Sequence, residues 1–445
     1  MHDAHDLRNI ERFLLEEVDE HYAYGYRGSL LSRLAVAAMH MNEYDLAAKA
    51  LEVRKTYHFD TILPMESSAI VRGLLRVHKI NEALNVLDEE LAVPLEPPSN
   101  QELAAAHKEK VKHRAQSIAS FASRECYEDN AVQALLACQM LREVGPIVRA
   151  AGLNAEEVNM PWLRIVKGAA QYESHRRKGM TKAYDDSGSN LLYTVLDAMA
   201  TFPSTNSDAV YESLSNALIR RTQFLTGAVD MTGLPKADRG EVAFIGKSNV
   251  GKSSLVNMIT NRKSLAYTSK RPGKTQQFNY FAINDKVELE REVKYGDVVN
   301  GEKDDDSFYI VDLPGYGYAE VPDYQKAAWK DFMAEYLSQR KTLRVLFHLL
   351  DGRHGPGAED AEIMAQVAST LPKSASYVVV LTKADKNVKG RAKRNSGKIS
   401  SRVMQKVKET MKDNGVSSAP IVLTSSESKF GRDKIWRYLK LAAES

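Results

Sequence analysis

The chain has 445 residues, too many for one ordinary domain, so we expect two or three. Hydrophobic residues make up 43% of the sequence and charged residues 27%, a composition that is typical of a soluble globular protein and excludes wholesale disorder. No stretch approaches the ~20 consecutive apolar residues of a membrane-spanning helix. Cys126 and Cys138 are the only cysteines, which argues against a disulfide framework and favours a reducing compartment.

Charge is distributed unevenly along the chain, although the formal net charge is only +3. From Arg239 onward there are 35 Lys and Arg against 25 Asp and Glu, whereas the preceding residues have 26 against 33. The C-terminal half is therefore the better candidate for contact with nucleic acid. Residues 1–20 are acidic and show neither a secretory signal nor an organellar transit peptide, so the compartment stays open at this level.

Residues 1–230 are predicted to form an all-α domain, because apolar residues recur there at intervals of three and four. Residues 32–53 align with residues 68–89, a period of roughly 36 that is typical of helical-pair repeats. These two segments resemble pentatricopeptide-type or tetratricopeptide-type repeats. Such a domain reads single-stranded RNA or packs against and binds protein, and its acidic character favours the second alternative.

Residues 231–240 are predicted to link this domain to a second one that spans 241–445. Short apolar runs alternate there with helical patterns, which predicts an α/β fold with a mostly parallel sheet and helices on both faces. The expected strands are 242–246, 308–313, 343–351, 377–382 and 420–425. Ligands of such sheets bind at the carboxyl ends of the strands.

A phosphate-binding loop is predicted directly after the first of these strands. The sequence "GKSNVGKS" fits G-x-x-x-x-G-K-[ST] and opens a helical pattern, so its backbone N–H groups are expected to surround phosphates at a helix N-terminus. We expect Lys252 to reach the β- and γ-phosphates and the Ser253 hydroxyl to coordinate Mg²⁺. The predicted nucleotide-binding residues of this loop are Gly246, Lys247, Ser248, Asn249, Val250, Gly251, Lys252 and Ser253.

A second motif, "DLPG", ends the strand 308–313. Asp312 is expected to hold Mg²⁺ directly or through water, and the Gly315 N–H is expected to sense the γ-phosphate. Leu313 and Pro314 lie between them and complete the predicted binding segment.

The base-binding residues are predicted at the ends of the last two strands. In "TKAD", the Asp385 carboxylate accepts two hydrogen bonds from guanine, whereas adenine presents the reverse pattern, so this residue selects GTP over ATP. The Lys383 side chain is expected to cover one face of the base. The segment "TSS" is expected to contact the guanine carbonyl. The residues concerned are Thr382, Lys383, Ala384, Asp385, Thr424, Ser425 and Ser426.

Together, "EVAFIGKSNVGKSSLVN", "TSKRPGKTQQFNYF", "DLPGYGYAEVP" and "VLTKAD" resemble the EngB/YihA-type ribosome-biogenesis GTPases, from residue 241 to about 442. The resemblance implies a P-loop GTPase that hydrolyses GTP to GDP and phosphate, slowly on its own, during assembly of the large ribosomal subunit. It implies that Thr275 completes the Mg²⁺ shell, within a switch segment of Gly273, Lys274, Thr275, Gln276 and Gln277. The chain departs from the family between Asp285 and Asp306, where a charged insertion predicts a longer hairpin or a partly disordered loop.

Tyr316 follows Gly315, where many GTPases have the glutamine that orients the attacking water. Some relatives of the family recruit K⁺ through a phosphate-loop asparagine, and Asn249 occupies that place. We therefore take Lys252, Thr275 and Asn249 as the candidate catalytic residues and leave Tyr316 as a residue that packs the switch segment or meets a partner.

The expected partners are GTP or GDP and precursors of the large ribosomal subunit, with the basic segment 383–412 as the candidate surface for ribosomal RNA. The N-terminal extension suggests a plastid or mitochondrial protein, and its own ligand is not indicated. The alternative is a helical-repeat RNA- or protein-binding protein whose nucleotide domain senses GTP without significant turnover.

Overall fold

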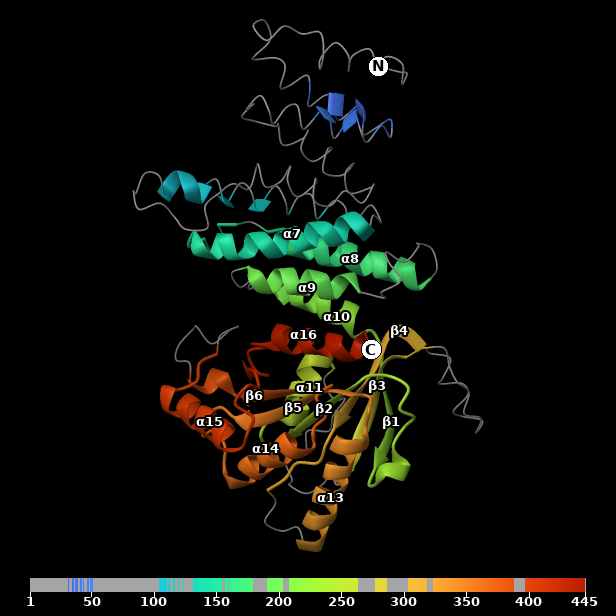
Figure 1. The fold of residues 1–445 in the computed structure, drawn as a ribbon, viewed down its shortest axis with the longest axis vertical. Helices are drawn as coiled ribbons and strands as arrows, with labels where there is room; N and C mark the ends of the chain where they lie inside the picture. The colour runs from blue at the N-terminus through green and yellow to red at the C-terminus, as the bar shows by residue number, and fades with distance from the viewer. Residues whose placement is uncertain are drawn as a thin grey trace, which may run out of the picture. The chain divides into compact units, whose positions relative to one another are not determined.

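The computed structural model describes residues 131–153, 160–178, 190–202, 208–262, 277–285, 303–317, 323–387 and 397–444, with shorter stretches between residues 31 and 123 and at 157–158. The chain divides into two compact units (Figure 1). Unit 1 comprises Met1–Tyr172 and Asp197–Thr205, and unit 2 comprises Glu173–Leu196 and Asn206–Ser445. Among the described residues, no helix has the length and apolar character needed to span a bilayer.

The described regular structure of unit 1 is helical, as predicted. It includes α7 (Ala131–Ala150), most of α8 (Trp162–Arg177) and the end of α9 (Leu191–Thr201). The Trp162 ring meets Phe202 edge-on at 5.3 Å between centroids, and Arg149 donates to the Thr201 carbonyl at 2.7 Å. In the repeat-like segment 32–53 the described core positions are buried, among them Ala35 and Ala47. Its predicted counterpart, 68–89, lies outside the described residues.

Unit 2 is built on a seven-stranded sheet in the order β1-β3-β4-β2-β5-β6-β7. The strands are β1 (Thr222–Ala228), β2 (Glu241–Gly246), β3 (Phe278–Asp285), β4 (Lys303–Asp312), β5 (Leu343–Asp351), β6 (Ser376–Thr382) and β7 (Ile421–Leu423). β4, β2, β5, β6 and β7 are parallel, and β3 and β1 are antiparallel to their neighbours. The predicted mostly parallel α/β fold is confirmed.

Helices cover both faces of this sheet (Figure 1). On one face lie α13 (Asp323–Gln339), α14 (Ala358–Thr370) and α15 (Ser401–Asp413), which pack onto an apolar core of the unit. On the other lie α11 (Lys252–Thr260) and α16 (Arg432–Ala443), where the Trp436 indole donates to the Ile259 carbonyl at 2.9 Å. α10 (Asp208–Leu218) precedes β1. The central strand β2 is buried along its whole length, which is why its sequence is an apolar run without alternation.

The predicted boundary at residue 230 lies too late for the sheet. β1 precedes it and pairs with β3, from Thr222 opposite Ile283 to Ala228 opposite Phe278. The sequence "TQFLTGA" did not predict this strand, because a half-exposed edge strand with a bulge has neither a continuous apolar run nor a clean alternation of apolar and polar residues. The whole predicted linker, 231–240, therefore lies inside the sheet domain: together with the short helix η2 (Met231–Gly233) at its start, it connects β1 to β2.

The charged insertion begins and ends in a hairpin. Asp285, the last residue of β3, pairs with Lys303, the first residue of β4, so the two described ends run antiparallel. Residues 286–302, which connect them, lie outside the described residues.

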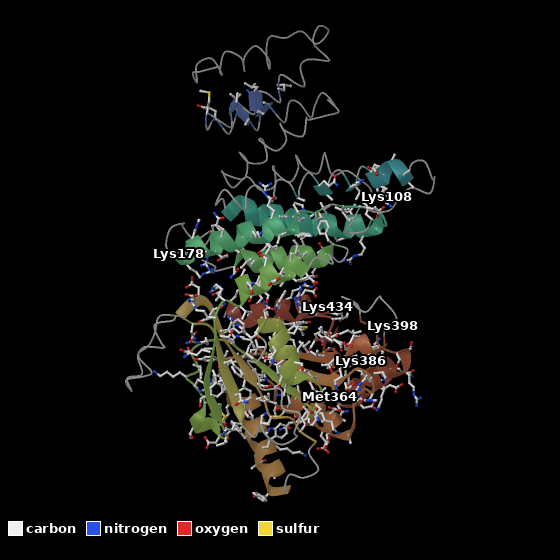
Figure 2. The ribbon with its side chains drawn as sticks, turned by 180° about the vertical axis from the view of Figure 1, so that it is seen from behind. Lys108, Lys178, Met364, Lys386, Lys398 and Lys434 are labelled. Atoms are coloured by element: carbon white, nitrogen blue, oxygen red, sulfur yellow. The ribbon has the colours of Figure 1, made fainter. Side chains whose placement is uncertain are left out.

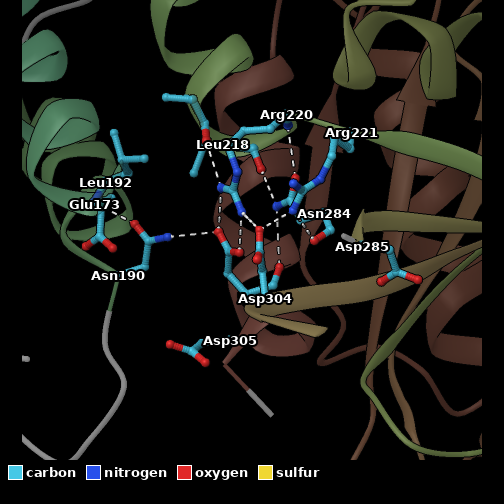
Figure 3. Close-up of polar contacts among 12 residues, drawn as sticks. Glu173, Asn190, Leu192, Leu218, Arg220, Arg221, Asn284, Asp285, Asp304 and Asp305 are labelled. Atoms are coloured by element: carbon cyan, nitrogen blue, oxygen red, sulfur yellow. Dashed lines mark hydrogen bonds and ion pairs between the residues drawn. The ribbon is translucent and has the colours of Figure 1, made fainter. Parts of the chain in front are cut away.

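An arginine pair holds the base of this hairpin (Figure 3). Arg220 donates to both carboxylate oxygens of Asp306, at 2.6 and 2.9 Å, and to Asp304 at 2.9 Å. Arg221 contacts Asp304 as well and donates to the Asn284 carbonyl at 3.0 Å. We call Arg220, Arg221, Asn284, Asp304 and Asp306 the hairpin clamp.

Candidate nucleotide-binding site

The phosphate loop connects the end of β2 to the start of α11. Gly251 has φ +108°, a value that L side chains rarely adopt, and α11 begins at the next residue, Lys252. Asn249 has φ +61°, in the left-handed region that asparagine tolerates better than most residues. The loop therefore turns at these two positions, and the first turn of α11 is free to present its N–H groups to an anion.

The carboxyl end of β4 brings Asp312 against this loop. The Lys252 ammonium contacts Oδ1 of Asp312, and both side chains are buried. The Leu313 N–H donates to the Phe244 carbonyl at 3.0 Å, so the pairing of β4 with β2 continues beyond Asp312. The lysine that we assign to the phosphates and the carboxylate that we assign to Mg²⁺ thus lie side by side.

Gly315 lies directly against the phosphate loop. A Cβ atom at this position would be 3.3 Å from both the backbone nitrogen and the Cα of Ser248, which is tighter than most real contacts. The Ser248 N–H donates to the carbonyl of Tyr316 at 2.9 Å. The absence of a side chain at Gly315 is therefore what lets the D-x-x-G segment approach the loop.

Two side chains join the base-recognition segment to the phosphate loop. The Thr382 hydroxyl donates to the Val250 carbonyl at 2.7 Å. The Lys383 ammonium donates to the Asn249 carbonyl at 2.7 Å and to Oδ2 of Asp351 at 2.9 Å. These bonds fix the phosphate loop and the segment that follows β6 relative to each other.

Asp385 lies in η4 (Ala384–Asn387) and is 3% exposed. The Ser425 hydroxyl donates to its Oδ1 at 2.5 Å, and the Ala384 N–H donates to the Thr424 carbonyl at 3.1 Å, so the two predicted base-binding segments meet here. Oδ2 forms an ion pair with the Lys386 ammonium at 3.2 Å and accepts no other hydrogen bond within the described part of the chain. A buried carboxylate oxygen with spare acceptor capacity fits the paired N–H donors of a guanine.

Asp385 is held in its ionised form. Burial on its own would raise the pKa of this carboxyl, but the hydrogen bond from Ser425 and the nearby Lys386 ammonium outweigh burial and lower the pKa below the ordinary value. At neutral pH the group therefore acts only as an acceptor, as guanine recognition requires.

The predicted site residues from the phosphate loop, the "DLPG" segment and the last two strand ends surround one edge of the sheet. The half-exposed Lys247 side chain forms an ion pair with Glu359, in the first turn of α14, at 2.9 Å. Ser253 is half-buried in the first turn of α11, and Gln277 is exposed just before β3. Four predicted switch residues lie outside the described residues: Gly273, Lys274, Thr275 and Gln276.

Sequence reasoning missed Asp351, which ends β5 and holds Lys383. Burial alone would raise the pKa of Asp351, but hydrogen bonds from Arg353 and Lys383 lower it well below the ordinary carboxyl value. Its position at a strand end was the available signal, because every other strand end of the parallel part carries a predicted site residue. Also missed were His348 and Asp360, the two partners of the Tyr316 hydroxyl.

Comparison with known proteins agrees with this arrangement. Residues 241–383 match the family model described as a 50S ribosome-binding GTPase. The probable GTP-binding protein EngB of Jannaschia sp. (strain CCS1) is 41% identical over 226 residues, which are 50% of this chain and 88% of that protein. The chain belongs to the EngB family.

A second EngB protein, from Hyphomonas neptunium, is 38% identical over 212 residues, 47% of this chain and 83% of that protein. The predicted family is thereby confirmed, together with the P-loop GTPase fold of the EngB-like domain. These relatives match about half of the chain, so the likeness covers the EngB-like domain and leaves the helical extension without a counterpart in them.

Proposed function

We propose that this EngB-family protein is a GTP-hydrolysing switch that acts in assembly of the large ribosomal subunit, inside a plastid or mitochondrion. Its membership of the family makes it a GTPase. One observation supports the specific assignment of residues best: the Lys383–Asn249 and Thr382–Val250 bonds join a phosphate loop to a buried, ionised Asp385. A guanine nucleotide is the ligand that has both a polyphosphate and the N–H pattern that Asp385 selects.

The donor set around Lys252 fits Mg²⁺. Hard cations of this size take oxygen ligands, and the site offers the Ser253 hydroxyl and the Asp312 carboxylate, with the Thr275 hydroxyl proposed as the third. Bound with GTP, Mg²⁺ neutralises charge on the β- and γ-phosphates. Lys252 is proposed to add a positive charge on the same phosphates. Gly315 is proposed to read the third phosphate, and its contact with Ser248 of the phosphate loop supports this role.

Asn249 is proposed to recruit K⁺. Its carbonyl already accepts from Lys383, and its φ of +61° turns the loop at this residue, so the side-chain amide is the group left to bind a cation. A monovalent cation there supplies positive charge that an arginine finger supplies in other GTPases. Single-turnover hydrolysis should be faster in K⁺ than in Na⁺, and Asn249→Ala should remove the difference; equal rates in the two salts would refute this role.

A basic helix is the proposed contact with ribosomal RNA. α15 buries Val403, Val407 and Met411 and exposes four basic side chains: Arg402, Lys406, Lys408 and Lys412. Lys386 and Lys398 lie on the same side of the unit (Figure 2). Side chains of this kind bind phosphates without reading sequence, and such binding weakens with salt.

Sedimentation with large-subunit precursors of each candidate compartment tests the proposal. We expect the protein to sediment with them in the presence of a non-hydrolysable GTP analogue and to be released with GDP. Raising the salt should weaken binding, and Lys406→Glu with Lys408→Glu should make the salt dependence shallower, by about one unit of logarithmic slope for each lost phosphate contact. Exposed Glu409→Gln and Asp413→Asn on the same helix are the matched controls.

Two outcomes would contradict the proposal. Equal sedimentation with GDP and with the GTP analogue would show that the protein is not a nucleotide-dependent switch. Absence of GTP turnover with K⁺, Mg²⁺ and excess ribosomal particles would favour the alternative, in which the domain senses GTP without significant hydrolysis. The helical unit 1 is proposed as a docking or targeting module, because it lies outside the part of the chain that matches EngB proteins.

A further inference from the structure

Tyr316 is anchored in the interior of the unit. Its side chain is 8% exposed, and its hydroxyl lies 2.6 Å from Nε2 of His348 on β5 and contacts Oδ1 of Asp360 on α14. The Trp329 ring of α13 lies 6.2 Å from the tyrosine ring, between centroids. The residue that stands where many GTPases have the water-orienting glutamine is therefore tied by its hydroxyl to β5 and α14.

The donors and acceptors in the hydrogen bonds between Asp360, Tyr316 and His348 can be assigned. Burial would raise the pKa of Asp360, but the His348 ring, the Gly357 N–H at 2.7 Å and the Tyr316 hydroxyl lower it, so Asp360 is an acceptor. The single proton of Tyr316 then goes to Asp360, and Nε2 of His348 must donate to the phenol oxygen. Nδ1 of the same ring lies 2.6 Å from the Tyr377 hydroxyl. The proton on Nε2 is assigned from this network.

This bonding excludes Tyr316 from proton chemistry. Burial and the neighbouring Asp360 carboxylate raise the pKa of the phenol well above its ordinary value, so it is no base at neutral pH. Its oxygen and its proton are both engaged, which leaves no group to orient a water molecule. Its effect on the site must therefore come through its position.

The backbone of Tyr316 connects the anchored side chain to the phosphate loop. Its carbonyl accepts the Ser248 N–H at 2.9 Å, and the preceding Gly315 lies against Ser248. One residue is thus held by its side chain at the N-terminus of α14 and by its main chain at the phosphate loop. Displacement of the side chain would move the Gly315 N–H relative to the phosphates.

We propose that Tyr316 is a positioning residue whose hydrogen bond to Asp360 fixes the Gly315 N–H at the γ-phosphate, so that preference for GTP over GDP depends on this bond. The inference rests on the proposed function, since it assumes that Gly315 reads the third phosphate. GDP lacks that phosphate, and its binding should be insensitive to the anchor.

The test compares affinities of the full chain for GDP and for a non-hydrolysable GTP analogue, both with Mg²⁺. Tyr316→Phe keeps the ring and removes the hydroxyl, and we expect it to weaken analogue binding about tenfold relative to GDP binding. Tyr336→Phe is the matched control: Tyr336 is fully buried and donates to Glu241 at 3.0 Å, at the opposite end of β2 from Gly246. It should lower the unfolding temperature and leave the analogue-to-GDP ratio unchanged.

Asp360→Ala provides a second, independent variant, because alanine has no acceptor for the Tyr316 hydroxyl. It should shift the ratio in the same direction, and the ratio of the double variant should be shifted no further than that of Asp360→Ala alone, because both changes remove the same bond. An unchanged ratio in either single variant, or additive effects on the ratio in the double variant, would overturn the inference. If the wild-type chain did not bind the analogue at all, the proposed function itself would be wrong. That result is distinguishable from an unchanged ratio in the variants, which would contradict only the inference about Tyr316.

Discussion

At the scale of single residues, Asp385 shows how the site reconciles burial with charge. A carboxylate at 3% exposure ordinarily becomes harder to ionise, yet Ser425 and Lys386 lower its pKa. Its Oδ1 is positioned by Ser425, and Oδ2 lies at the edge of the site beside Lys386. We therefore propose that specificity for the base depends also on Ser425, whose hydroxyl positions the Asp385 carboxylate.

Asp385→Asn should reverse the base preference. An amide donates where the carboxylate accepted, so GTP loses two charge-assisted hydrogen bonds and xanthosine triphosphate gains a donor for its carbonyl. We expect GTP affinity to fall about a hundredfold or more in competition titrations. Ser425→Ala should weaken GTP binding less and keep the preference. The exposed Asp331→Asn on α13 is the control, and unchanged selectivity in Asp385→Asn would refute the assignment.

The sequence was sufficient to predict the positions of residues that lie at a strand end, and the roles assigned to them stay predictions. Lys252, Asp312 and Asp385 fall in this group, because a parallel sheet brings such ends to one edge. Asp351, His348 and Asp360 were missed because their roles depend on partners far along the chain, such as Lys383 for Asp351 and Tyr316 for Asp360. No spacing rule connects such pairs.

At the scale of elements, the β3–β4 hairpin links the proposed switch to the residues before β1. β4 ends at Asp312, beside Lys252, and starts near Asp304 and Asp306, in the hairpin clamp. These two acidic residues lie in the segment that the sequence predicts to be a charged insertion. They hold Arg220 and Arg221 against the sheet (Figure 3).

Arg220→Ala should destabilise unit 2. Asp306 is 4% exposed and would keep a buried charge after losing its bidentate partner, so we expect a loss of roughly 3 kcal/mol in the free energy of unfolding by urea. Lys330→Ala breaks the exposed Lys330–Glu362 pair and should cost less than about 1 kcal/mol. Similar small losses for both variants would mean that the clamp contributes little.

Elements were predicted well where burial alone determines the pattern. β2, β5 and β6 are apolar because helices cover both faces of the sheet, and their runs were found. β3 was missed because Asn279, Asn284 and Asp285 interrupt its apolar sequence, although most of the strand is buried. Asn284 and Asp285 are buried in ion and hydrogen-bond networks with arginines, which a one-dimensional pattern does not reveal.

At the scale of the whole molecule, the change from a helical to an α/β sequence lies near residue 240, whereas the folded unit begins earlier. Unit 2 takes in α10, β1 and residues 173–196, although all of them precede the G domain predicted from sequence. The physical reason is that β3 needs a partner on its outer edge. β1 supplies it, and the aromatic contact of Phe224 with Phe281, at 5.6 Å between centroids, lies across this pair.

Two shortened chains distinguish the sheet-based boundary from the sequence-based one. A chain that starts at Asp208 keeps α10, β1 and both clamp arginines, so we expect cooperative thermal unfolding and GDP binding close to that of the full chain. A chain that starts at Arg239 leaves the β3 edge unpaired and Asp304 and Asp306 without their arginines, and it should unfold at least 10 °C lower or aggregate, since a loss of several kcal/mol shifts the midpoint by about 2–4 °C per kcal/mol in a domain of this size. Equal midpoints for the two chains would show that β1 and the clamp are dispensable, and would restore the boundary near residue 240.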